Sequence, residues 1–270
     1  MRVFVVDAFT DTAFRGNPAG VVLLTAAAGD FAGGSLPPSS WMQDVATELR
    51  HSETAFVVAR PDGSHDLRWF TPLTEVDLCG HATLATTHVL AGVTDRGTFD
   101  FHTRSGLLHT SVGVNGSITM DFPAAPLEQL TGVAGLQRAL RTAPVSVHRA
   151  GQDVLVELAD ADAVARLDPD LHGLAGVEAR GIVVTAAADA GADHDFVSRF
   201  FAPQVGVDED PVTGSAHCAL APFWSARLGR TVLTGVQLSP RGGRVGVEVM
   251  SGRVRLHGRA VTVLDGTLRV

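Results

Sequence analysis

One local pattern occurs twice in this chain of 270 residues and constrains its fold more than any other feature. The first copy reads Trp69-Phe70-Thr71-Pro72, then Asp77-Leu78-Cys79-Gly80-His81-Ala82-Thr83-Leu84-Ala85. The second reads Phe200-Phe201-Ala202-Pro203, then Asp208-Glu209-Asp210-Pro211-Val212-Thr213-Gly214-Ser215-Ala216. Each copy combines an aromatic strand end, a proline turn, an acidic loop and a glycine that opens an alanine-rich helix. We interpret the pattern as an internal duplication, which predicts two similar lobes.

Both copies place a glycine at the first position of the expected helix, at Gly80 and at Gly214. The first backbone N–H groups of a helix have no partner inside the helix, and the helix dipole is positive at that end. Helix starts of this kind bind anions such as carboxylates. Two such starts predict two lobes that share one site for a small carboxylate-bearing substrate.

The charge balance restricts both the chemistry and the partners. With 29 acidic and 21 basic side chains the formal net charge is −8, which argues against general binding to nucleic acid or to anionic membranes. Lys is absent, which excludes a Schiff-base lysine and a P-loop lysine. Tyr is absent too, so acid–base chemistry is expected from Asp, Glu, His or Cys.

The two cysteines, Cys79 and Cys218, are too few for a disulfide framework and indicate a reducing cytosol. The N-terminal residues enter a strand pattern at once and meet an acid at Asp7, unlike a signal peptide. No apolar run approaches the length that spans a membrane. We therefore expect a cytoplasmic protein.

Apolar spacing predicts few helices and many strands, which indicates the α+β class rather than a doubly wound α/β sheet. Two prolines in residues 123–126 make that segment the expected linker between an N-terminal lobe, 1–122, and a C-terminal lobe, 123–270, whose final strand can cross back to the first lobe. The expected strands are 2–8, 21–24, 55–59, 66–70, 154–157, 181–185 and 196–201, and the tail from Val232 is rich in further strands. The expected helices are 39–50, 80–91 and one that begins at Gly214, and residues 25–34 are expected to form a loop of small residues.

Glu53 is the strongest candidate for proton transfer. It follows a predicted helix and precedes an apolar run, with Ser52 and Thr54 able to hydrogen-bond to it. A carboxyl group partly removed from water favours its neutral form, and can then both give and take a proton near neutral pH. The alternative interpretation is a loop acid or a capping partner for a neighbouring turn.

Cys79 and His81 lie at the start of the first repeated helix. A thiol there can have a lowered pKa and act as a base, while an imidazole can bind substrate or relay a proton. The alternatives are a small buried hydrophobe for Cys79 and a helix-start residue bonded to a carbonyl for His81. Cys218 falls inside the second helix and is expected in the core.

The second copy of the pattern offers an acidic side chain and a candidate carboxylate-binding helix start. Asp210 matches Cys79 when the copies are aligned without a gap, in an acidic loop that can orient a ligand or simply face solvent. Gly214 and Ser215 can hold a carboxylate through backbone N–H groups and a hydroxyl, or they can form an ordinary helix start. No His-Glu-x-x-His motif, paired-cysteine motif, dinucleotide fingerprint or Gly-x-Ser-x-Gly elbow is present, so we expect no metal and no cofactor.

Taken together, several blocks of the chain resemble the PhzF-like (phenazine biosynthesis) family. Any one block is weak, but they occur in the family's order and span most of the chain. The blocks are Asp7-Ala8-Phe9-Thr10, Gly16-Asn17-Pro18-Ala19-Gly20, Ser52-Glu53-Thr54-Ala55-Phe56-Val57, Gly80-His81-Ala82-Thr83-Leu84-Ala85 and Asp210-Pro211-Val212-Thr213-Gly214-Ser215-Ala216.

The resemblance implies a diaminopimelate-epimerase-like fold: two pseudo-twofold lobes, each a mixed sheet wrapped around a central helix, with the active site between them. It also implies a homodimer and a cofactor-free isomerisation like that of trans-2,3-dihydro-3-hydroxyanthranilate, in which a proton moves along a conjugated system. The family's catalytic glutamate, histidine and second-lobe acid match Glu53, His81 and Asp210. Substrate contacts are implied for the following residues: Asn17, Cys79, Gly80, Gly214 and Ser215.

Two departures from the family pattern affect the function. Related epimerases use one cysteine from each lobe, whereas Asp210 stands where the second thiol is expected, which argues against a two-thiol racemase. The phenazine enzyme has proline after its helix-start histidine, whereas this chain has Ala82, so the substrate can be another metabolite. The alternatives are an epimerase that uses Cys79 with Glu53 as its partner, and a binding protein without turnover.

Overall fold

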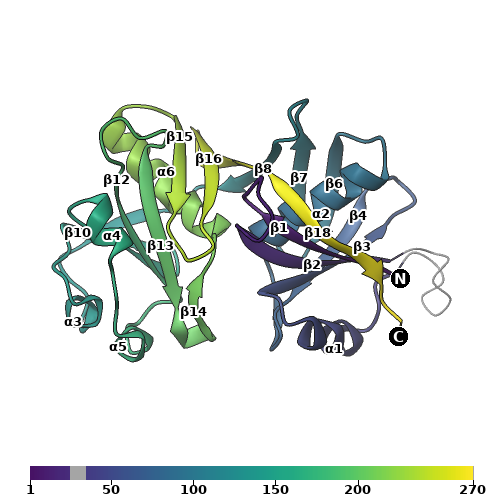
Figure 1. Cartoon of the computed structure of the whole chain (residues 1–270), viewed down its shortest axis with the longest axis horizontal. Helices are drawn as coiled ribbons and strands as arrows, with labels where there is room; N and C mark the ends of the chain where they lie inside the picture. Colours follow the sequence, from purple (N-terminus) through teal and green to yellow (C-terminus); the bar gives the residue numbers. More distant parts are fainter. Residues whose placement is uncertain (25–34, 270) are drawn as a thin grey trace. The chain divides into compact units, whose positions relative to one another are not determined.

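The computed structural model describes residues 1–24 and 35–269, so the predicted loop at 25–34 lies outside the described residues. The chain divides into two compact units, the first made of Met1–Asp121 with His257–Val270 and the second of Phe122–Leu256 (Figure 1). Each unit is a mixed β-sheet with few helices, which confirms the predicted α+β class.

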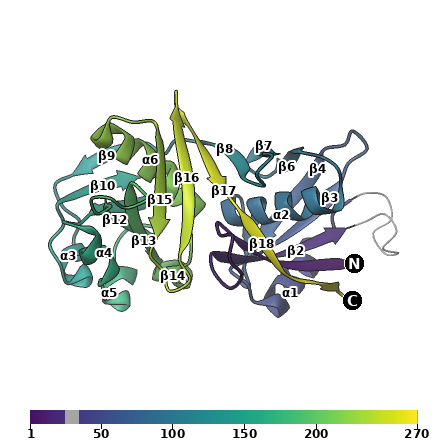
Figure 2. The ribbon, with the colours of Figure 1, turned by 45° about the horizontal axis from the view of Figure 1, so that its top comes forward.

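In the first unit, strands from both ends of the chain lie side by side. β18 (Ala260–Thr267) pairs antiparallel with β1 (Arg2–Ala8), as Figure 2 shows. From β1 the sheet continues through neighbouring pairs, of which β2–β3 and β4–β6 are parallel and the others antiparallel. The remaining strands are β2 (Asn17–Leu24), β3 (Glu53–Ala59), β4 (His65–Phe70), β5 (Glu75–Val76), β6 (Thr98–Thr103), β7 (Gly106–Val112) and β8 (Ile118–Pro123).

The second unit repeats this order. β9 pairs with β10, and the sheet continues through β11, β12, β13 and β15 to β16, with β14 on β13. Here β11–β12 and β13–β15 are the parallel pairs. The strands are β9 (Leu127–Leu130), β10 (Ser146–Ala150), β11 (Asp153–Glu157), β12 (Ile182–Ala187), β13 (Phe196–Ala202), β14 (Val207–Asp210), β15 (Val232–Gln237), β16 (Gly243–Met250) and β17 (Arg253–Gly258).

The two sheets therefore correspond strand by strand, including the position of both parallel pairs. β2, β3, β4 and β6 of the first unit have the same order and directions as β11, β12, β13 and β15 of the second. A shared sequence of parallel and antiparallel pairings is what a duplicated chain produces, so the repeat predicted from the sequence is reproduced in the fold.

A central helix lies against each sheet. α2 (Gly80–Val93) packs against β1, β2, β3, β7 and β18 and is buried on nearly all sides. Three of its buried threonines donate a hydrogen bond from the side-chain hydroxyl to the backbone carbonyl four residues earlier, so these hydroxyls need no water as a partner. A helix that is apolar around its whole circumference belongs in a core. The opposite face of this sheet carries α1 (Ser39–Leu49), whose Met42, Val45 and Ala46 pack on Phe56 and Phe70.

In the second unit the central helix is α6 (Gly214–Leu228). The Trp224 ring stacks on Phe196 of β13, and its indole N–H donates to the Thr185 hydroxyl on β12 at 2.9 Å. Away from α6, three short helices complete the core formed by Val154, Val156 and Val184. These helices are α3 (Leu136–Leu140), α4 (Ala161–Ala165) and α5 (Leu171–Ala175), and a 3₁₀ turn (Pro203–Val205) precedes β14.

Three local predictions were wrong in a way that matters for function. The strand expected at 21–24 already begins at Asn17, because both edges of β2 are paired, with β1 and with β3. The strand expected at 55–59 already begins at Glu53, since Glu53 pairs with Ala19 of β2. The acids at 208–210 belong to β14 rather than to a loop, because this segment pairs with β13.

A bidentate ion pair fixes the strand that leads to each central helix. In the first unit Arg68 of β4 donates to Glu75 of β5 at 2.6 and 2.5 Å, and its guanidinium lies over the Phe70 ring. In the second unit Arg199 of β13 donates to Glu209 of β14 at 2.7 and 2.9 Å and lies over Phe201. The same arginine–glutamate ion pair at corresponding positions of the two units is a further product of the duplication.

We expect Glu209→Gln to lower the free energy of unfolding by about 1.5–3 kcal/mol, because it breaks charge-assisted bonds to an arginine whose side chain is only 12% exposed. The matched control is Asp265→Asn in the pair with Arg2, where both side chains are about half exposed and the loss should stay below about 1 kcal/mol. Urea unfolding of both variants measures the difference. Equal losses would show that the Arg199–Glu209 pair has no special stabilising role.

Candidate active site

The predicted site residues fall into two groups, one in each unit. The first unit holds Asn17, Glu53, Cys79, Gly80 and His81. The second holds Asp210, Gly214 and Ser215, whereas Cys218 is a core residue of α6, with its thiol bonded to the Gly214 carbonyl. Each group gathers at the start of the central helix of its unit.

Glu53 is positioned by the edge of the first sheet. It is the first residue of β3, where its neighbour Ser52 donates to the Asn17 side-chain oxygen at 3.2 Å. Asn17 begins β2 and is fully buried. The parallel pairing of β2 and β3 thus places the Asn17 amide next to Ser52, the residue before Glu53. The Glu53 side chain is 20% exposed.

Cys79 and His81 are positioned by the start of α2. Cys79 is the N-cap residue, and its carbonyl accepts from the Thr83 N–H at 3.1 Å and from the Thr83 hydroxyl at 2.6 Å. No side chain caps this helix start. The backbone N–H groups at Gly80 and His81 come too early in the helix for an intrahelical bond, and they are the groups an anionic ligand would use.

Glu53, Cys79 and His81 form one cluster. The Cys79 sulfur lies 3.5 Å from His81 Nδ1, and His81 Nε2 lies 3.3 Å from Glu53 Oε2. One donor atom from each of the three residues lies within 4.8 Å of the other two. The imidazole therefore stands between a thiol and a carboxylate, a set of groups that can hold protons or bind a metal ion.

Burial controls the charge of His81. Its side chain is 6% exposed, and burial lowers its pKa to about 3. The ring is therefore neutral near pH 7, and its contact with Glu53 is not an ion pair despite the short distance. His81 Nε2 also makes no hydrogen bond to the part of the chain that the structure describes. A buried ring nitrogen without a bond is costly, so this atom is suited to a ligand.

The start of α6 is held by a different network. Asp210 accepts from the Thr213 hydroxyl at 2.5 Å, and the Gln237 side-chain amide donates to the Asp210 carbonyl at 2.7 Å. Gln237 also accepts from the Thr213 N–H at 2.9 Å. Asp210 and Thr213, the N-cap of α6, are therefore locked together by a glutamine that is fully buried on β15.

Arg180 adds a positive charge at the start of α6. It donates to both carboxylate oxygens of Asp153, at 2.8 and 2.5 Å, and to the Ser215 hydroxyl at 3.1 Å. Its side chain remains 39% exposed. Sequence reasoning missed both Arg180 and Gln237, because each lies outside the repeated pattern and far from the start of α6 along the chain, 35 residues from Ser215 and 24 from Thr213.

The strand registers show which residues of the two units correspond. Thr54 pairs with Phe70, and Ile182 pairs with Phe201, which is the repeat partner of Phe70. The position of Glu53 in the first unit is therefore taken by Gly181 in the second. A side chain there is excluded, because a Cβ on Gly181 would lie 2.3 Å from the Phe200 ring. When the helix starts Gly80 and Gly214 are aligned, Thr213 and Ser215 correspond to Cys79 and His81. The ungapped match of Asp210 to Cys79 was therefore wrong, since Asp210 ends β14 instead.

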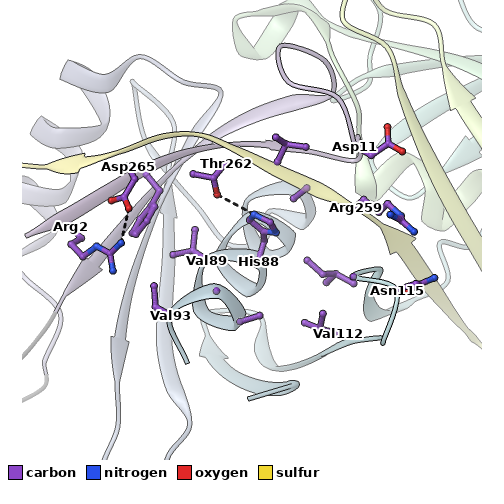
Figure 3. A pocket seen from close by; sticks show the side chains of 17 residues that line it. Arg2, Asp11, His88, Val89, Val93, Val112, Asn115, Arg259, Thr262 and Asp265 are labelled. Atoms are coloured by element: carbon purple, nitrogen blue, oxygen red, sulfur yellow. Dashed lines mark hydrogen bonds and ion pairs between the residues drawn. The ribbon is translucent and has the colours of Figure 1, made fainter. Parts of the chain in front are cut away.

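A separate cavity of about 570 Å³ opens toward the other end of α2 (Figure 3). It is lined by residues of that helix end, of β1 and of β18, and by none of the predicted site residues. Within it Arg2 is paired with Asp265, and His88 with the Thr262 hydroxyl. Its charged and polar groups are partly paired with one another, and it lacks Glu53 and His81, so the helix starts are the stronger candidate site.

Known proteins extend this description. Residues 6–266 match the family described as phenazine biosynthesis-like protein. A Pseudomonas aeruginosa protein named as an uncharacterized isomerase is 46% identical over 100% of this chain and 99% of its own. The crystal structure of a PhzF family phenazine biosynthesis protein from Enterococcus faecalis gives a TM-score of 0.91 with 38% identity, covering 100% of this chain and 99% of that one.

The fold and these matches define a class of α+β proteins built from two units, each with a mixed sheet. A hydroxyproline epimerase from Agrobacterium vitis shares this fold, with a TM-score of 0.61 at 12% identity over 98% of this chain and 91% of that one. The chain belongs to the phenazine biosynthesis-like (PhzF) family. Among the described residues no helix is long and apolar enough to cross a membrane.

His217, one turn into α6, provides a test of the burial at this helix start. Its Nδ1 lies 2.8 Å from the Thr213 carbonyl, and burial lowers its pKa from 6.5 to about 4. The folded state therefore binds fewer protons than the unfolded state between these values. Its contribution to stability is complete above pH 6.5 and is lost as the pH falls toward 4, by at most about 1.4 kcal/mol per pH unit.

We expect the unfolding free energy of the wild-type protein to fall more steeply than that of His217→Asn between about pH 7 and pH 4.5. Asn can keep a donor toward the Thr213 carbonyl but does not titrate. Denaturant unfolding at several pH values measures the two slopes, and the contribution of buried His81 is common to both proteins. Parallel curves would contradict the burial of a neutral His217.

Proposed function

We propose that this protein is a cofactor-independent isomerase that moves a proton within a small carboxylate-bearing metabolite, similar to the isomerisation of trans-2,3-dihydro-3-hydroxyanthranilate. The observation that carries the proposal is the cluster of Glu53, Cys79 and His81, in which a half-buried carboxylate lies 3.3 Å from a buried neutral imidazole. The membership of the chain in the PhzF-like family supports an isomerase.

In the proposed reaction Glu53 takes a proton from one carbon and returns it to another carbon of the same conjugated system. Its carboxylate becomes neutral when it takes the proton and charged again when it returns it, so no redox partner is needed. The exposure that remains at Glu53 gives a substrate carbon a route to the oxygen.

His81 orients the substrate and stabilises the charge that moves through it. As a neutral ring it has one donor and one acceptor nitrogen, and its Nε2 has no hydrogen-bond partner among the described residues. A carbonyl or hydroxyl of the substrate can occupy that position. The open N–H groups at Gly80 add hydrogen bonds that cost no rearrangement during the reaction.

The second unit offers the means to bind a carboxylate. The N–H groups at Gly214 and Ser215 begin α6, the Ser215 hydroxyl lies beside them, and Arg180 contributes a positive charge at 3.1 Å from that hydroxyl. We assign Asp210 to orienting a polar group of the substrate, with Thr213 and Gln237 holding it in place.

The duplication explains why one unit would carry the chemistry. In the second unit Gly181, Thr213 and Ser215 stand at the positions of Glu53, Cys79 and His81, so the titratable groups are replaced by hydrogen-bonding groups or by none. Proton transfer is accordingly proposed for the first unit and anion binding for the second.

An epimerase that uses Cys79 is the second candidate, favoured by the 3.5 Å contact between its sulfur and His81 Nδ1. Inversion by two bases needs them on opposite faces of one carbon, each about 3–3.5 Å from it, or roughly 6–7 Å apart. Cys79 and Glu53 offer donor atoms within 4.8 Å of each other, which is too close for such a pair. The spacing therefore supports isomerisation with Glu53 as the only base.

We expect Glu53→Gln to reduce turnover of trans-2,3-dihydro-3-hydroxyanthranilate by about 10²–10⁴-fold while the fold is unchanged, because the amide cannot take a proton. Absorbance and mass changes in deuterated buffer measure the reaction. Glu48→Gln, the same substitution on the exposed face of α1, is the matched control and should retain full activity.

Full activity of Glu53→Gln would overturn the proposed mechanism. Absence of turnover in the wild type would remove this substrate and direct the assay to a panel of small amino and hydroxy acids. Deuterium at a stereocentre that disappears in Cys79→Ser would establish the epimerase instead. A ligand that raises the melting temperature without proton exchange would indicate a binding protein.

We expect Arg180→Gln to raise KM about tenfold or more with a smaller change in kcat, because Arg180 is proposed to attract the carboxylate rather than to take part in proton transfer. Arg149→Gln, which removes a surface arginine bonded only to the Glu178 carbonyl among the described residues, is the control. Steady-state kinetics separate the two constants. An effect confined to kcat would contradict the proposed role.

A further inference from the structure

The Glu53–Cys79–His81 cluster has the composition of a transition-metal site. Thiolate, imidazole and carboxylate are the three ligand types that zinc takes in proteins, and catalytic zinc is commonly held by three protein ligands with one position left for water. Within the described residues this is the one group of three or more such side chains whose donor atoms lie close enough to hold an ion.

The distance between the carboxylate and the imidazole suits zinc. With bonds of about 2.0–2.3 Å, two donors of a tetrahedral zinc ion lie roughly 3.3–3.8 Å apart. His81 Nε2 is 3.3 Å from Glu53 Oε2, and one donor atom from each of the three residues, with either ring nitrogen counted for His81, lies within 4.8 Å of the other two. The imidazole can offer only one nitrogen, and Nε2 is the suitable one, because it is buried, lacks a hydrogen bond and faces the carboxylate.

We propose that Glu53, Cys79 and His81 form a binding site for Zn²⁺ and that the ion inhibits the enzyme. Binding uses Glu53 Oε2, His81 Nε2 and the Cys79 sulfur, whose proton is released to the buffer, and a water completes the coordination. The ion enters beside Glu53, the most exposed of the three side chains.

The inhibition rests on the proposed function, whereas the binding does not. A zinc ion on Glu53 would occupy the oxygen that is proposed to take the substrate's proton, and it would also occupy the nitrogen of His81 proposed to bind the substrate. Isomerase activity should therefore fall as one equivalent of Zn²⁺ is added, and a chelator should restore it.

The second unit provides an internal control for the ligand set. At the start of α6 the corresponding positions are Gly181, Thr213 and Ser215, none of which is a ligand that zinc prefers. The only other cysteine, Cys218, is buried in α6, where burial raises its pKa to about 12, so its thiol does not ionise readily to bind metal. The protein should hence bind one ion rather than two.

The experiment titrates Co²⁺ and Zn²⁺ separately into the complete, chelator-free protein. With Co²⁺ as a spectroscopic probe, bound thiolate gives a charge-transfer absorption band in the near ultraviolet, and Zn²⁺ should remove it at one equivalent. Calorimetry then gives the Zn²⁺ affinity of the wild type and of Cys79→Ser, Glu53→Gln and the matched control Cys218→Ser. We expect the first two variants to bind at least about 100-fold more weakly, and the control to bind like the wild type.

Absence of the band in wild-type protein would overturn the site, whether or not any variant folds. Unchanged affinity in Cys79→Ser that retains its circular dichroism would overturn it as well, as would loss of affinity in Cys218→Ser. The experiments can reject the zinc site without rejecting the proposed isomerase mechanism, and the mechanism without rejecting the zinc site. A cobalt band together with full turnover by Glu53→Gln would retain the metal site and reject the proposed mechanism, and the reverse pattern would reject the metal site alone.

Discussion

The bidentate pairing of an arginine with a glutamate, once in each unit, is the interaction on which the rest of the structure depends. Arg68 with Glu75 and Arg199 with Glu209 each join a long central strand to the short strand that follows its proline turn. That short strand leads to the first residue of the central helix. The ion pair thus fixes the position at which the helix begins. It thereby also fixes the positions of the helix-start N–H groups and of the side chains beside them.

Given that framework, a few substitutions decide what each helix start can do. The first unit has a carboxylate, a thiol and an imidazole where the second has glycine, threonine and serine at corresponding positions. Gly181 is fixed by the Phe200 ring, which leaves no space for a Cβ, so the second unit could not regain a glutamate without repacking β13. The packing of one aromatic ring therefore maintains the chemical difference between two otherwise similar units.

The sequence predicted the elements that depend on local pattern. The helices at α1, α2 and α6 and the strands β1, β4, β11 and β13 follow from apolar spacing and glycine starts, and they lie within a few residues of the expected bounds. What it could not predict depends on partners far along the chain. Asn17 and Glu53 became strand residues only because β2 and β3 pair with each other. Gln237 of β15 and Arg180, which precedes β12, contact α6 from 24 and 35 residues away along the chain. Local propensity contains no information on such pairings.

The candidate site shows the same division between local and non-local information. The motif around Gly80 identified Cys79 and His81, and the local pattern together with the family resemblance identified Glu53, but no sequence spacing shows that these residues meet. Their meeting changes the interpretation of each one. His81 alone would be an ordinary buried histidine, and Cys79 a small hydrophobic residue; beside Glu53 they form a set that can relay a proton or bind a soft metal ion. Because the same atoms would serve both purposes, substrate and zinc would compete for Glu53 and His81 under the proposed function.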